Sequence, residues 1–252
     1  MKLFQYSENF IKEIECSQTP IFHYIFIFLF SVLMRNFLEI FAYTQFGINE
    51  FYPHLHYTLY YMAIGLAYVV ILFLFTKTQI LKALKIVFLF FPIIIIGPAL
   101  DLVFKIFCYS TDLGYLQPEI HGDLFYYFIR FFGNHSDTLG PSLGYRIEVG
   151  LVLLFSMLYV FLKTKSYSKT LYSLAVTYSV IFFFCSTPYV LEWIFQSNYS
   201  TLVIPYYAII FIILLLICLF HLNENVFVLI LNDIRLPRLL HFEFMLIGGI
   251  IY

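Results

Sequence analysis

Long apolar stretches alternate with short polar segments along almost the whole chain, and this spacing predicts membrane-spanning helices. A helix needs about 20 mainly apolar residues to cross the hydrocarbon core of a bilayer. The stretches of this length lie at about residues 21–42, 57–75, 86–107, 143–162, 170–187 and 205–220. The pattern therefore predicts an all-α integral membrane protein, built as a bundle of six complete transmembrane helices.

The two ends of the chain follow a different pattern. Before the first span, Leu3, Tyr6, Phe10 and Ile14 recur at helical spacing among charged residues, which predicts an amphipathic interfacial helix over residues 1–20. The six spans form a membrane domain over residues 21–222. Residues 223–252 are expected to form a cytosolic linker and a truncated seventh span, so we expect the chain to be a fragment of a longer protein.

The connection over residues 108–142 is the longest between the predicted spans, and it is rich in aromatic residues. Residues 118–133 read as a short helix, and six of the eight residues from Phe125 to Phe132 are Phe or Tyr. This segment is too short to cross a bilayer, so we expect an interfacial or re-entrant helix in the outer loop.

Composition and charge agree with a multi-pass protein of the cell membrane. The chain is 62% hydrophobic and 12% charged, with a mean hydropathy of +0.89, and no basic pattern indicates nucleic-acid binding. Cytoplasmic loops of membrane proteins carry an excess of Lys and Arg, so the distribution of these residues predicts a cytoplasmic N-terminus. Ten of the 14 then lie inside: Lys2, Lys12, Lys77, Lys82, Lys85, Lys163, Lys165, Lys169, Arg235 and Arg238.

The third span contains the most unusual local pattern in the chain. Pro92 and Pro98 each remove a backbone donor, so we expect two kinks, the second just before Asp101. Asp101 and Lys105 are four residues apart and share a helix face. Interrupted helices with adjacent charges are typical of transport sites, and ionisable residues in a span usually face the bundle interior.

Charged residues on three different spans are expected at similar depth in the outer half of the bundle. At 1.5 Å per residue, Arg35 lies about 10 Å below the outer end of its span, Asp101 about 9 Å and Glu148 about 7 Å. We expect these three to meet, with Arg35 pairing both carboxylates. The candidate substrate-binding residues are Arg35, Glu39, Asp101, Lys105, Arg146 and Glu148.

Three interpretations of the outer charges stay open at this point. Positive and negative residues balance, which fits a structural ion-pair network, and the same residues fit a site for a lipid phosphate or another polar head group. A metal site in the outer loops is a third interpretation, although the spacing of its ligands is not diagnostic and no metal or cofactor is assigned. Its candidate ligands are Glu50, His54, His56, His121, Asp123, His135 and Asp137.

The C-terminal segment DIRLPRLLHFEFMLIGGIIY, residues 233–252, resembles the start of the first helix in the UbiA family of intramembrane prenyltransferases. The resemblance implies that a prenyltransferase domain follows, holding Mg²⁺ and a prenyl diphosphate on NxxxDxxxD motifs. Asn225 and Asp233 have the outer spacing of that motif, but Leu229 occupies its middle position. The preceding six spans would then be a fused N-terminal membrane domain.

Two classes of function follow. The first is a membrane domain that serves a UbiA-like prenyltransferase in isoprenoid or lipid-linked metabolism, with membrane lipid, a lipid phosphate or a prenyl substrate as its partner. The second is a transporter of small molecules or lipids, with the Pro-interrupted helix at its site. Neither class decides whether this part of the chain is itself an enzyme.

Overall fold

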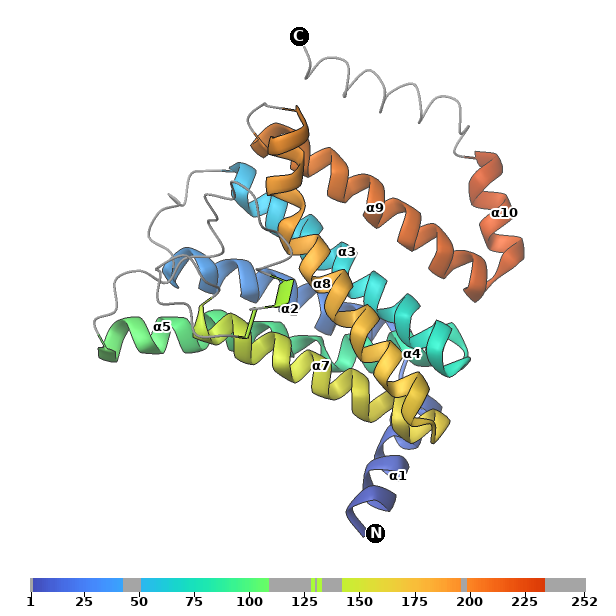
Figure 1. The fold of residues 1–252 in the computed structure, drawn as a ribbon. Coiled ribbons are helices and arrows are strands. Elements are labelled where there is room, and N and C mark those ends of the chain that lie inside the picture. The colour runs from blue at the N-terminus through green and yellow to red at the C-terminus, as the bar shows by residue number, and fades with distance from the viewer. Residues whose placement is uncertain are drawn as a thin grey trace.

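The computed structural model describes residues 2–42, 51–108, 128–129, 131–132, 142–195 and 199–233. All regular secondary structure in these ranges is helical (Figure 1). The elements are α1 (Lys2–Cys16), α2 (Ile21–Ala42), α3 (Phe51–Thr76), α4 (Ile80–Phe90), the 3₁₀ helix η1 (Phe91–Ile95), α5 (Ile96–Cys108), α7 (Leu143–Thr164), α8 (Tyr167–Phe195), α9 (Tyr199–Leu222) and α10 (Glu224–Asp233).

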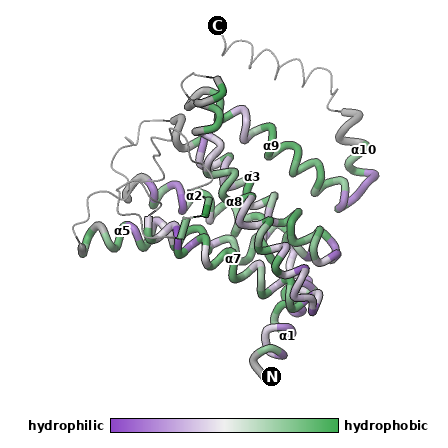
Figure 2. The backbone as a smooth tube through the Cα atoms, in the orientation of Figure 1, coloured by the Kyte–Doolittle hydropathy of each residue, from purple (hydrophilic) through white to green (hydrophobic). Residues whose placement is uncertain are grey.

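Six helical segments are long and apolar enough to cross a membrane, as the sequence predicts, and they are compatible with a polytopic membrane protein. Hydrophobic residues follow most of α9, and polar residues gather where α9 meets α10 (Figure 2). In the described part of the chain the segments are Ile21–Glu39, Leu55–Thr76, Ile80–Phe104, Leu143–Thr164, Tyr167–Pro188 and Leu202–Leu222. The predicted truncated span and most of the predicted outer-loop helix lie outside the described residues.

α3 is the central helix of the bundle and packs against α2, α4, α7, α8 and α9 (Figure 1). Its side chains Ala63, Val69 and Leu72 are fully buried. Gly65 allows the close approach of α2, because a Cβ at this position would overlap the Phe28 ring. This arrangement leaves α7 and α8 on one side of α3 and the broken helix α4–η1–α5 beside α2 and α7.

The break in the third span is a single 3₁₀ segment rather than the two kinks expected from its prolines. Pro92 is in the first turn of η1, where its missing backbone donor ends the α-helix that precedes it. Pro98 is in the first turn of α5. A first-turn residue has no N–H partner within its own helix, so proline is tolerated there and produces no second kink.

The fifth apolar segment ends at Pro188, as predicted, but helix α8 continues through this proline to Phe195. Pro188 leaves the carbonyl of Phe184, four residues earlier, without its usual helical donor. The Tyr207 hydroxyl of α9 donates to this carbonyl at 2.6 Å. A side chain from the neighbouring helix therefore replaces the missing backbone bond. The sixth helix also begins earlier than predicted, at Tyr199, with Pro205 in its interior.

The predicted N-terminal helix is present as α1, and one stripe of it is buried against the bundle. Ile11, Ile14 and Glu15 are buried, whereas Tyr6 is 74% exposed and Phe10 is 44% exposed. Residues at positions i, i+3 and i+4 share one helix face, so the burial of Ile11, Ile14 and Glu15 defines a single docking stripe. The polar partners of Glu15 on α7 fix this stripe, and helical periodicity alone does not show them.

Candidate functional site

Arg35 is the centre of the buried charge cluster. It lies on α2, its side chain is 1% exposed, and its Nε donates to Glu39 Oε1 at 2.5 Å, one helical turn further along. The Tyr61 hydroxyl of α3 donates to the same carboxylate oxygen at 3.1 Å. The guanidinium also lies 5.1 Å from the centre of the Tyr61 ring. This local pairing allows one turn of a membrane-spanning helix to hold two buried charges.

Arg35 also connects α2 to the broken helix and to α7. Its Nη1 donates to the carbonyl of Ile94 in η1 and to Glu148 Oε2 of α7. In an uninterrupted α-helix the Ile94 carbonyl would accept from the backbone N–H of residue 98, but this residue is a proline and Ile94 belongs to the 3₁₀ segment η1. Arg35 therefore binds a carbonyl at the break in the third span. This confirms that Arg35 and Glu148 meet across the bundle.

Asp101 has a structural role at the start of α7. Its Oδ2 accepts from Ser142 Oγ at 2.5 Å, and its Oδ1 accepts from the Gly144 backbone N–H at 2.9 Å. Ser142 is the N-cap of α7 and accepts from the Tyr145 N–H at 3.1 Å. A carboxylate at a helix N-terminus is stabilised by free N–H groups and by the helix dipole. Asp101 is thus a cap supplied by another helix.

Two glycines let α5 and α7 cross close enough for these contacts. A Cβ on Gly97 would overlap the Glu148 carboxylate and Arg35 Nη1. A Cβ on Gly144 would overlap the Gly97 carbonyl and the Asp101 carboxylate. The cluster therefore depends on both positions having no side chain.

The structure brings together only part of the predicted site. Arg35, Glu39 and Glu148 are in direct contact, and Asp101 binds the first turn of α7 beside them. Arg146 is only partly buried, and its spacing of two residues from Glu148 places the two on different faces of α7. The Lys105 side chain lies outside the described residues. Within the described part of the cluster, Arg35 accompanies the three buried carboxylates Glu39, Asp101 and Glu148. The side chains of Arg130 and Glu192 also lie outside the described residues, so the balance of charges stays a prediction.

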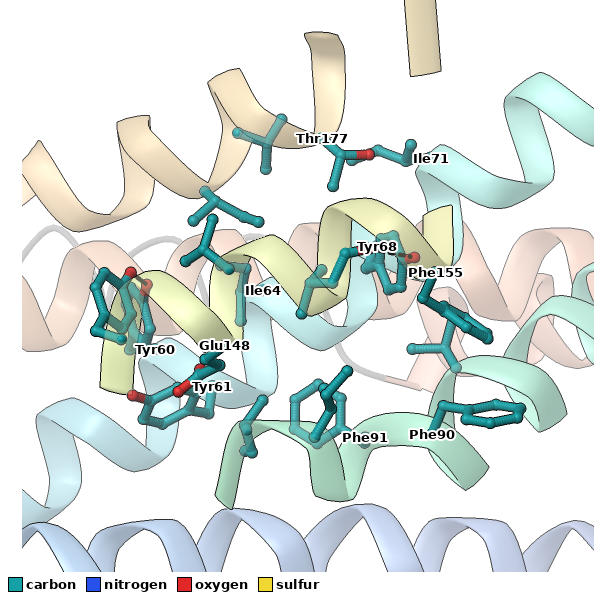
Figure 3. Close-up of a pocket in the computed structure, with 18 residues that line it drawn as sticks. Tyr60, Tyr61, Ile64, Tyr68, Ile71, Phe90, Phe91, Glu148, Phe155 and Thr177 are labelled. Carbon is teal, nitrogen blue, oxygen red and sulfur yellow. Dashed lines mark hydrogen bonds between the residues drawn. The ribbon is translucent and has the colours of Figure 1, made fainter. Parts of the chain in front are cut away.

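A cavity of about 60 Å³ adjoins the cluster, and Glu148 forms part of its wall. Glu148, Tyr60 and Tyr61 lie at one end of the cavity, and Tyr68, Phe90 and Phe155 lie at the other (Figure 3). Apart from Thr177 of α8, its remaining wall comes from aliphatic and aromatic residues of α3, α4, η1, α7 and α8. The cavity is therefore apolar along its length and has a carboxylate at one end.

A second polar group lies next to the carboxylate end of the cavity. The Tyr60 hydroxyl is 3.0 Å from Cys185 Sγ and 3.5 Å from the Tyr145 hydroxyl, and Tyr145 also contacts Cys185 Sγ. Tyr60 and Tyr145 both line the cavity. Sequence analysis missed these residues because tyrosines are frequent throughout the chain, so neither position stands out.

Of the candidate metal ligands, only His56 has a described side chain, and it stacks between Tyr57 and Tyr207. The other six candidates lie where the chain or its side chains are outside the described residues. Among the residues that are described, no group of three or more His, Cys, Asp or Glu could hold a metal ion.

Comparisons with known proteins do not assign the chain to a family. No family model matches it, and no curated protein or solved structure is similar to it. The resemblance of residues 233–252 to the UbiA family gains no support from these comparisons, and all of this segment except Asp233 lies outside the described residues. The function must therefore be argued from the broken helix, the charge cluster and the cavity.

Proposed function

We propose that the protein is a membrane transporter for a small molecule, with its binding site at the broken helix α4–η1–α5. The observation that carries this proposal is the position of Glu148, which is both a wall of the cavity and a partner of the Arg35 guanidinium. Any molecule that binds the Glu148 carboxylate therefore acts directly on the cation that occupies the break.

The broken helix supports this proposal. Transporters often bind their substrates where a membrane helix is interrupted, because the open backbone groups and helix ends there are available to a ligand. The Ile94 carbonyl is such a group, and Arg35 occupies it in this state. Ionisable residues inside a span commonly mark transport pathways.

The polar end of the cavity favours a substrate that donates hydrogen bonds. Its wall at this end consists of the Glu148 carboxylate and the phenols of Tyr60, Tyr61 and Tyr145. A phosphate would have to displace Glu39 or Glu148 from Arg35, leaving a carboxylate buried without its cation, which typically costs about 3–5 kcal/mol. The cluster therefore suits an amine or hydroxyl group better than the lipid phosphate expected from the sequence.

A lipid-binding role in isoprenoid or lipid-linked metabolism is the second candidate, and the aromatic wall of the cavity favours it. The volume of about 60 Å³ argues against a bound prenyl chain in this state. A cavity that accepts benzene measures about 150 Å³, so even one isoprene unit would require the aromatic side chains to move. A transported molecule needs the same expansion only at one stage of its passage.

Cysteine accessibility distinguishes the two candidates. Val152 lines the cavity, whereas Leu154 on the same helix is exposed on the outer surface of the bundle. We would place Val152→Cys or Leu154→Cys in a chain whose native cysteines are replaced, and reconstitute each variant in vesicles. An impermeant methanethiosulfonate reagent is then applied to each face of the membrane.

Transport requires water to reach the cavity from both faces at different times, so Val152→Cys should react from either side and Leu154→Cys from neither. Reaction of Val152→Cys from one face alone would contradict transport and would favour a cavity that only binds a ligand. Reaction only with a bilayer-soluble maleimide would favour the lipid-binding role.

A further inference from the structure

We propose that α1 is a gate that closes one end of the cavity and must move away from α4 and α7 for that end to open. The inference rests on the proposed transport function. It is carried by contacts of α1 with the residues that form the cavity's aromatic end and with residues one turn beyond it.

A ring contact between α4 and α7 forms part of the wall at the aromatic end of the cavity. Phe90 of α4 and Phe155 of α7 both line the cavity, and their ring centroids are 4.5 Å apart (Figure 3). Phe10 of α1 packs edge-on against Phe90 from outside the cavity, at 6.4 Å between centroids. An opening at this end therefore requires Phe90 and Phe155 to separate, and α1 contacts one member of the pair directly.

Glu15 of α1 holds the other member in place through α7. It is 6% exposed and accepts from the Tyr159 hydroxyl at 2.9 Å and from Lys163 Nζ at 2.5 Å. Tyr159 stacks on Phe155, with ring centroids 6.4 Å apart. A buried carboxylate with two charge-assisted or hydroxyl donors is a strong local restraint. Glu15 thus fixes the part of α7 that begins one turn beyond Phe155.

α1 contacts both α4 and α7 and is attached at its ends. Near its N-terminus, Glu8 pairs with Lys165, and Phe4 contacts Phe161 with centroids 5.6 Å apart. Just after its C-terminus, the Ser17 carbonyl accepts from Lys85 Nζ of α4 at 2.6 Å. The segment between Cys16 and Ile21 is not helical and can act as a hinge.

The rest of α1 is weakly held, as a moving element must be. Only Ile11, Ile14 and Glu15 are buried among its described side chains. Elements with few buried apolar contacts open at lower free energy than the core around them. A helix that served only as an anchor would not need a buried ion pair directed at the turn beside the cavity.

The test measures access to the cavity from the membrane face on which α1 lies. The parent is the Val152→Cys protein described above, and the gate variant adds Glu15→Gln, which keeps the shape of the side chain and removes its charge. Glu13→Gln is the matched control, because Glu13 is an exposed carboxylate on the same helix. The measured quantity is the rate of reaction with the impermeant methanethiosulfonate reagent.

Weakening one buried charge-assisted contact should raise the labelling rate from the α1 face by about tenfold or more, because the open state becomes more populated. Glu13→Gln should leave the rate unchanged. The charge-swapped double variant Glu15→Lys with Lys163→Glu should return the rate toward that of the parent, which excludes simple misfolding.

Three results would overturn the gate, and they can be told apart. If Val152→Cys reacts from both faces and Glu15→Gln leaves the rate unchanged, α1 is not a gate and the transport proposal stands. If Val152→Cys reacts from neither face with or without Glu15→Gln, both proposals are wrong. If Glu15→Gln prevents folding, the test is made with the charge-swapped double variant. A labelling rate in that variant that does not return toward the slow rate of the parent also contradicts the gate.

Discussion

Pro98 and Pro188 each lie four residues after a carbonyl that accepts a hydrogen bond from the side chain of another helix, and the two donors differ in charge. At Pro188 the open carbonyl of Phe184 accepts from the neutral Tyr207 hydroxyl, and α8 continues as a regular helix. At Pro98 the carbonyl of Ile94 accepts from the charged Arg35, in a helix already interrupted by η1.

The charge on Arg35 brings further residues into contact with the break. A buried guanidinium requires counter-ions, and Arg35 has Glu39 on its own helix and Glu148 on α7. Glu148 in turn faces the cavity. The break at η1 is therefore coupled to a cavity through an ion pair. At Pro188, by contrast, the carbonyl is bound by the Tyr207 hydroxyl, and this contact involves no charged group. We interpret the first as a functional element and the second as a structural one.

Removing the Arg35 guanidinium should have the largest effect on stability. Arg35→Leu leaves two buried carboxylates without their cation, so we expect a loss of about 3–5 kcal/mol in the free energy of unfolding. Thermal unfolding of the detergent-purified protein measures this loss. Arg146→Leu is the control, because Arg146 is only partly buried and should change stability by less than about 1 kcal/mol. Equal effects would contradict the special role of Arg35.

Placing a methyl group against the Arg35–Glu148 ion pair should have the next largest effect on stability. Gly97→Ala places a methyl group against the Glu148 carboxylate and Arg35 Nη1, so the ion pair must separate or the helices must shift. Overpacking of this kind typically costs about 1–3 kcal/mol. Gly150→Ala on α7 is the matched control, because its Cβ would meet only Phe132, at 4.0 Å. If the thermal unfolding midpoint of Gly97→Ala is as high as that of Gly150→Ala, α5 and α7 cross less closely than described.

Removing the Tyr207 hydroxyl should have an effect of similar size, confined to stability. Tyr207→Phe deletes the hydroxyl that donates to Phe184, which leaves a buried carbonyl without this donor and should cost about 1–3 kcal/mol. Labelling of Val152→Cys should be unchanged in this background. Tyr206→Phe, at the adjacent partly buried position, controls for loss of a hydroxyl. Altered access in Tyr207→Phe would remove the distinction between the two prolines.

Replacing the prolines themselves should have the smallest effects on stability, with different consequences. Pro188→Ala restores a backbone N–H that shares the Phe184 carbonyl with Tyr207, so little should change. Pro98→Ala introduces an N–H that competes with Arg35 for the Ile94 carbonyl. We expect the labelling rate of Val152→Cys to change in Pro98→Ala alone. Equal rates in the two variants would show that the break is not coupled to the cavity.

Much of the fold could be predicted because membrane spans have a direct signature in apolar length. The starts of α2 and α7 agree with the prediction at Ile21 and Leu143. Prolines were harder to interpret, because their effect depends on donors from other helices. Neither the Tyr207 contact with Phe184 nor the Arg35 contact with Ile94 has a local sequence signal.

The candidate site was predictable in its residues and less so in their roles. Equal depth on separate spans correctly placed Arg35 with Glu148, because charges in an apolar medium are stabilised by meeting. The capping role of Asp101 was missed, although Ser142 just ahead of an apolar run is a helix-start signal. The cavity was unpredictable, since it is formed by side chains from five elements that pack incompletely.

The most direct test of the account is a double-mutant cycle between Arg35 and Glu148, measured both by stability and by labelling of Val152→Cys. Arg35→Lys and Glu148→Gln are each made alone and together. Because the two side chains form one buried ion pair beside the cavity, we predict a coupling energy of about 1–3 kcal/mol and a non-additive change in labelling rate. Effects that add to within about 0.5 kcal/mol, with additive labelling rates, would contradict the claim that the broken helix and the cavity are joined through this pair.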